Sequence, residues 1–120
     1  MNIIDCILQI PTKSEANCRD HWAVKAKRVK TQRKETFLTC RQEFGIVQIP
    51  KDSKITVELM RVATRKVDSD NLQSSLKAAR DGVADYLQID DGSGRINWVY
   101  SQQYLAKTNY VALRITIFDD

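Results

Sequence analysis

Hydrophobic and polar residues alternate in four segments of the chain, and an alternation with a period of two is typical of β-strands that bury one face. The clearest case places Ile55, Val57 and Leu59 on one side of the segment, with Thr56 and Glu58 between them. Turn-forming glycine, proline or asparagine residues lie near the ends of these segments. The four predicted strands are residues 3–10, 54–64, 96–104 and 110–118.

Two other segments repeat their apolar residues every three or four positions, as amphipathic helices do. The longer predicted helix covers residues 17–44, and its apolar stripe consists of Trp22, Ala26, Val29, Phe37, Cys40 and Phe44. The shorter one begins near Asp70 or Asn71, which are both favoured N-cap residues. Its buried stripe consists of Leu72, Leu76, Ala79, Val83 and Leu87.

In chain order these elements are β-α-β-α-β-β, and the length of 120 residues suits one domain, residues 1–120. Helices separated by strands predict an α+β fold with two layers. We expect a mixed β-sheet with both main helices on one face.

The net charge of +4 is unevenly distributed. Residues 13–41 contain nine basic and three acidic residues, and Lys27, Lys30, Lys34 and Arg41 form a basic stripe on the first helix. Four aspartates, by contrast, lie between residues 81 and 91. A basic surface beside an acidic pocket suits a polyanionic partner and a divalent cation. Charge alone equally allows a solvated basic helix with ordinary surface acids.

No stretch approaches the 18 or so apolar residues of a membrane span, so we expect no membrane partner. The first residues have no basic region before their short apolar run, which argues against an export signal. The three cysteines are therefore expected to be reduced thiols in the cytoplasm. Cys18 and His21 have C-x-x-H spacing, but two ligands do not complete a zinc site.

Aspartates lie at both ends of the second helix. Asp68 and Asp70 precede it, and Asp90 and Asp91 follow it, about 25 Å away at 1.5 Å per residue. The two pairs can meet if the later pair folds back, or if they belong to different subunits. Carboxylates without histidine or cysteine favour Mg²⁺ or Mn²⁺. The alternative is purely structural: Asp70 caps the helix, Asp90 starts a turn, and no metal binds.

The segment DSDNLQSSLKAARDGVADYLQIDD resembles the signature of the RusA-type Holliday junction resolvases. That signature consists of D-x-D-N, a lysine early in the helix, an aspartate one turn later and a D-D pair before a strand. The matching residues here are Asp68, Asp70, Asn71, Lys77, Asp81, Asp90 and Asp91. The basic first helix is also similar, and the order of elements agrees from about residue 17 to 118.

The resemblance implies a homodimeric, Mg²⁺- or Mn²⁺-dependent endonuclease that resolves four-way DNA junctions by paired cleavage. It implies that Asp68, Asp70 and one of Asp90 and Asp91, with Asp91 favoured, hold the metal, and that Lys77 is the catalytic lysine. The phosphate contacts expected on this hypothesis come from Lys27, Lys30, Lys34, Arg65 and Lys66.

Two positions depart from the family pattern. Ser74 stands where the family has its lysine, and Lys77 follows three residues later. Either Lys77 still reaches the site, or the lysine role is lost or supplied by Lys66. The sequence DDGSGRI is also two residues longer than the usual D-D-x-x-I. The alternatives are therefore a non-catalytic nucleic-acid-binding module and a degenerate resolvase.

Overall fold

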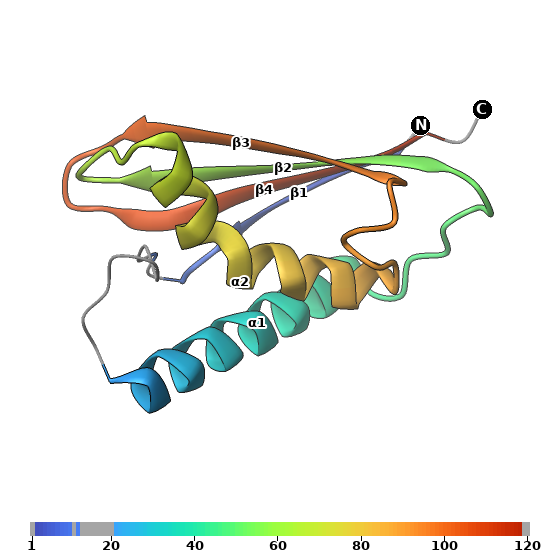
Figure 1. Ribbon diagram of the computed structural model, residues 1–120. Coiled ribbons are helices and arrows are strands. Elements are labelled where there is room, and N and C mark those ends of the chain that lie inside the picture. Colours follow the sequence, from blue (N-terminus) through green and yellow to red (C-terminus); the bar gives the residue numbers. More distant parts are fainter. Residues whose placement is uncertain (1, 11, 13–20, 119–120) are drawn as a thin grey trace.

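The computed structural model describes residues 2–10, 12 and 21–118 and shows a four-stranded β-sheet with two helices on one face (Figure 1). The predicted α+β class and the order β-α-β-α-β-β are confirmed. Neither of the helices in these residues is long and apolar enough to cross a bilayer. The elements are β1 (Asn2–Leu8), α1 (Trp22–Phe44), β2 (Lys54–Ala63), α2 (Ser69–Leu87), β3 (Ile96–Tyr104) and β4 (Asn109–Phe118).

The strand order in the sheet is β1-β4-β2-β3, and the sheet is mixed as predicted. β4 is antiparallel to both of its neighbours, whereas β2 and β3 are parallel. A parallel pair needs a crossover connection, and α2 provides it. The chain therefore enters α2 at one end of the sheet and returns to β3 at the other end. This topology places the two predicted aspartate pairs at opposite ends of α2.

The core consists of the positions that the alternating pattern predicted. Val57 and Leu59 of β2 are fully buried, as are Val111 and Ile115 of β4. All five predicted stripe residues of α2 are buried against this sheet face, which confirms that prediction. The sheet strands end within two residues of their predicted limits.

The predicted stripe of α1 is correct from Val29 onward, where its residues are buried or partly buried, and wrong at Trp22 and Ala26. Cys40 is buried and Phe44 is partly buried, but Trp22 is 74% exposed and Ala26 is also exposed. The buried residues of α1 are Gln32, Thr36 and Cys40, so none lies in the first ten residues of the helix. Figure 1 shows the reason: the two helices converge toward their C-terminal ends and diverge toward their N-terminal ends.

The start of α1 also differs from the prediction. Residues 17–20 of the predicted helix lie outside the described residues, and His21 is the N-cap of a helix that begins at Trp22. The imidazole Nδ1 of His21 accepts a hydrogen bond from the backbone N–H of Ala23 at 3.2 Å. His21 is therefore used as the helix cap, and Cys18, the other residue of the C-x-x-H pair, lies outside the described residues.

The helices approach most closely at Gly82 of α2. A Cβ atom on Gly82 would lie 2.5 Å from the carbonyl oxygen of Arg33 and 2.7 Å from the Cβ of Thr36. Thr36 satisfies its hydroxyl by donating to the carbonyl of Gln32 at 2.8 Å, so a polar residue is tolerated in this contact. Toward the helix ends, the Tyr86 hydroxyl donates to the Gly45 carbonyl at 2.7 Å.

Candidate functional site

Asp68, and not the predicted Asp70 or Asn71, is the N-cap of α2. Its side chain accepts a hydrogen bond from the backbone N–H of Asn71 at 2.9 Å, and its own backbone is extended. Asp70 lies in the first helical turn and is exposed, where a negative charge is favoured by the helix dipole. One of the predicted metal ligands thus has a structural role within its own helix.

The loop before Asp68 is held in place by two residues that the sequence did not single out. The side-chain amide of Gln102 on β3 accepts from the Val67 N–H at 3.0 Å and donates to the Val67 carbonyl at 2.6 Å. Arg61 of β2 donates to the carbonyl of Arg65 at 2.5 Å. The loop therefore has a defined shape, and it leaves Arg65 and Lys66 exposed.

A pocket of about 330 Å³ lies at the other end of α2, between this helix and α1. It is lined by Arg33 of α1 together with Asp81, Asp85, Asp90 and Asp91, so four carboxylates surround one cavity. Arg33 binds Asp85 in a bidentate pair, with N–O distances of 2.6 and 2.8 Å, and its charge lies 4.0 Å from Asp81. The hydrogen bond from Arg33 lowers the pKa of Asp85.

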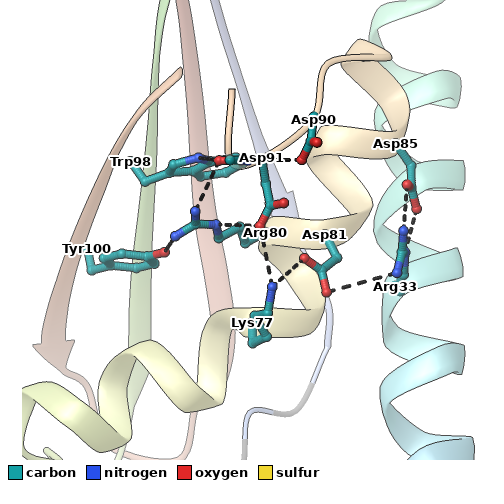
Figure 2. A network of polar contacts seen from close by, with 10 residues as sticks. Arg33, Lys77, Arg80, Asp81, Asp85, Asp90, Asp91, Trp98 and Tyr100 are labelled. Atoms are coloured by element: carbon teal, nitrogen blue, oxygen red, sulfur yellow. Dashed lines mark hydrogen bonds and ion pairs between the residues drawn. The ribbon is translucent and has the colours of Figure 1, made fainter. Parts of the chain in front are cut away.

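Lys77 joins two of these carboxylates (Figure 2). Its Nζ atom lies 2.9 Å from Asp81 Oδ1 and 3.3 Å from Asp91 Oδ2. The hydrogen bond to Asp81 is the main reason that the pKa of Lys77 is raised. Its side chain is nevertheless 58% exposed, so the ammonium group can exchange these partners for a ligand.

Arg80 fixes the position of Asp91 and is largely occupied in doing so. Its Nε lies 3.2 Å from Asp91 Oδ2, one terminal nitrogen donates to the Asp91 carbonyl at 3.2 Å, and the other donates to the Tyr100 hydroxyl at 2.6 Å. The guanidinium also stacks over the Trp98 ring at 4.7 Å, and Trp98 Nε1 donates to the same Asp91 carbonyl at 3.3 Å. Figure 2 shows Arg80 enclosed between Asp91 and the two rings of β3.

The pKa of Asp91 shows which influence dominates around it. Burial raises this pKa, but the hydrogen bond and charge of Lys77, followed by the charge of Arg80, outweigh it and lower the pKa. Asp90 is more exposed, and its carboxylate accepts from the backbone N–H of Gly92 at 3.0 Å, as in a turn-forming aspartate.

The structure brings together only part of the predicted catalytic set. Asp91 contacts Lys77, so the loop after α2 folds back along the helix, but it does not reach the Asp68 and Asp70 pair. It folds back only that far, because Lys77 lies seven residues, or about 10 Å of helix, beyond Asp70. Among the described residues, no three His, Cys, Asp or Glu side chains form a group that could hold a metal ion. Asp68 and Asp70 lie at the start of α2, and Asp90 and Asp91 lie after its end.

The predicted basic residues Lys27, Lys30 and Lys34 are all exposed on α1. Lys30 and Lys34 line a shallow hollow with Arg33 and Asp85, directly beside the four carboxylates. The basic residues of α1 therefore lie next to the acidic pocket, as the charge distribution along the sequence predicted.

Arg33 and Arg80 are the site residues that the sequence reasoning missed. A signal for both exists, since each occupies a position of an apolar stripe: Arg33 lies four residues from Val29 and from Phe37, and Arg80 lies between Leu76 and Val83. A basic residue in such a stripe is expected to have a carboxylate partner nearby.

No model of a known protein family matches the chain, and no curated protein matches it. The function of the chain is therefore inferred from its residues and from their geometry.

Proposed function

We propose that the chain is a RusA-like endonuclease that acts with Mg²⁺ or Mn²⁺ on branched DNA, such as four-way junctions, in the cytoplasm. The observation that carries this proposal is the position of Lys30 and Lys34 of α1 beside the carboxylate pocket of α2, in which Lys77 bridges Asp81 and Asp91. Cations beside carboxylates are what a phosphodiester-cleaving site requires.

In this proposal the exposed cations bind the DNA backbone without reading its sequence. Lys27, Lys30 and Lys34 contact phosphates along α1, and Arg65 and Lys66 contact phosphates near the start of α2. Lys77 exchanges one of its carboxylate partners for the phosphate that is cleaved, where its charge stabilises the developing negative charge. Arg80 meanwhile keeps Asp91 in place.

The metal enters as the group that would activate the attacking water. The described carboxylates of a single chain do not complete its binding site. Mg²⁺ in phosphoryl-transfer sites commonly uses one or two carboxylates and completes its shell with water and substrate phosphates. In a homodimer the start of α2 from one subunit can also face the pocket of the other, and two sites give paired incisions.

The test compares four proteins on a synthetic four-way junction with Mg²⁺ or Mn²⁺: the wild type, Asp70→Asn, Asp91→Asn and Lys77→Ala. We expect the wild type to make paired nicks and the three variants to bind the junction but to cut it at least 100-fold more slowly. Asp5→Asn is the matched control, because Asp5 pairs with Arg114 at 2.7 Å on the sheet face without helices. A wild-type protein that binds the junction but makes no nicks with either metal would contradict the proposal.

The second candidate is a nucleic-acid-binding module without catalysis. It is favoured by one observation: Asp81, Asp85 and Asp91 each form an ion pair with a basic side chain of the same chain. Under this reading the pocket is an ion-pair network that joins the two helices. Binding of the junction by wild type and Asp91→Asn with equal affinity and no cleavage by either would support it.

A further inference from the structure

Trp22, at the start of α1, lies where α2 has diverged from α1, so its ring is not covered by the rest of the described chain. Its side chain is 74% exposed, the largest exposure of any tryptophan or phenylalanine among the described residues. A tryptophan that stays in water forgoes the burial of about 150–250 Å² of surface. Tryptophan is enriched at interfaces, where its large apolar ring can be covered by a partner.

The surroundings of Trp22 are cationic. Between His21 and Lys34 the chain has six lysines and arginines and no carboxylate: Lys25, Lys27, Arg28, Lys30, Arg33 and Lys34. Lys27 and Lys30 are exposed, and no residue of α1 before Gln32 is buried. The ring of His21 lies beside that of Trp22, with a centroid distance of 5.5 Å. The first three turns of α1 therefore present aromatic rings among positive charges.

We propose that the first turns of α1 bind an unpaired nucleic-acid strand, with a base stacked on Trp22 and a phosphate held by Lys30. This inference rests on the proposed action on branched DNA and adds a contact with bases that become unpaired at the branch point. Aromatic side chains combined with basic ones are the usual means of binding single strands, because every base offers a ring to stack on.

The position of Trp22 relative to the pocket fits a strand that follows the helix. Trp22 and Arg33 are eleven residues apart, which is three helical turns, so they lie on the same side of α1 about 16 Å apart. A stacked strand advances about 3.4 Å per nucleotide, and this span corresponds to about five nucleotides. A strand stacked on Trp22 thus reaches the carboxylate pocket beside Arg33 and Lys34.

Two other occupants of this surface fit the residues less well. A second copy of the same helix would bring like charges together, which disfavours association. A membrane surface requires one continuous apolar face, but Lys25, Lys27 and Lys30 are distributed around the helix and not along one side.

The test uses the fluorescence of Trp22 and needs no cleavage. The chain has two tryptophans, so the difference between wild type and Trp22→Phe isolates the Trp22 signal from that of Trp98. We expect a single-stranded oligothymidylate to quench the Trp22 emission and a hairpin duplex of equal length to leave it unchanged. Stable folding of each variant is checked by its melting temperature, which a substitution at this exposed position should leave unaltered.

Affinity measurements by fluorescence anisotropy complete the test. Trp22→Ala should lower the affinity for the single strand and for an open junction about tenfold and for the duplex less than twofold, and Trp22→Phe should retain most of the affinity. Leu38→Ala is the matched control, since Leu38 is a 50% exposed apolar residue of the same helix. Leu38→Ala should change the affinity for none of these three DNA forms.

Several outcomes overturn the inference. It fails if Trp22→Ala weakens duplex and single-strand binding equally, or if that substitution dissociates a dimer. It also fails if anionic lipid vesicles, and not the oligonucleotide, quench Trp22. Failure of the two proposals can be told apart. If single strands quench Trp22 but the protein cleaves no junction, this inference is upheld and the proposed nuclease activity is contradicted. If Trp22→Ala binds and cuts like the wild type, the nuclease activity is upheld and this inference is contradicted.

Discussion

The close approach of the helices at Gly82 makes a sharp prediction about stability. In an ordinary helix, glycine to alanine stabilises by about 1 kcal/mol. At Gly82 the new Cβ would lie only 2.5 Å from the Arg33 carbonyl oxygen, whereas ordinary contact begins at 3.4 Å. The backbone of α1 would have to move by the difference, 0.9 Å. Neither the carbonyl nor the Cβ of Thr36 can rotate away.

Overpacking of this kind costs about 1–3 kcal/mol, and a contact with backbone belongs at the upper end. After subtraction of the helix-propensity gain, we expect Gly82→Ala to lower the free energy of unfolding by about 1–2 kcal/mol. Because α1 carries Arg33, its displacement should also weaken the pair with Asp85. The site and the stability of the fold are coupled at this glycine.

The assay is urea unfolding followed by far-ultraviolet circular dichroism. Gly92→Ala provides the control, since a Cβ there meets nothing closer than Asp90 Oδ1 at 3.7 Å. The control should change stability by less than about 0.5 kcal/mol. The reasoning is refuted if Gly82→Ala unfolds at a higher urea concentration than the wild type, because helix propensity would then outweigh the contact.

Three further substitutions test individual contacts. Asp68→Ala should cost about 1 kcal/mol of unfolding free energy through loss of the N-cap, while Asp68→Asn keeps the cap and its melting temperature; equal losses would contradict the capping role. Arg33 lowers the pKa of Asp85 below its ordinary value of 3.8, so the ion pair stabilises the fold above pH 3.8. This contribution is at most about 1 kcal/mol at such an exposed site, and it is lost as the pH falls further. In melting curves measured over a pH series, Arg33→Met should therefore lose less stability in acid than the wild type. Tyr86→Phe removes the 2.7 Å hydrogen bond to the Gly45 carbonyl and should cost about 1 kcal/mol in urea unfolding, and no change would mean that water replaces the bond.

The fold could be predicted from the sequence because burial follows the period of each element. In β2 every second residue meets the core, and in α2 the stripe from Leu72 to Leu87 is buried along its whole length. The stripe of α1 looks equally good in the sequence, but a pattern does not show how far its cover extends. Trp22 is exposed because α2 diverges from α1 before reaching it.

The site was only partly predictable, since its contacts depend on a loop. Asp91 meets Lys77 because the chain reverses after α2, with Gln88 in the left-handed conformation at a φ of 57°. Spacing along a helix gives the pair Lys77–Asp81 directly, four residues apart. It does not give the partners of Arg80, because Trp98 and Tyr100 come from a strand that follows the loop.

The uneven cover of α1 also means that one helix has two different stabilities. Backbone amides of its second half are locked by the contact at Gly82, so they should exchange with deuterium only when the two helices separate. Those between residues 24 and 31 have no buried side chain over them and can open in a local fraying event. A ligand that keeps the first turns of α1 ordered would slow amide exchange there without altering exchange in the rest of the helix. Amide exchange along α1 would therefore report where a ligand binds.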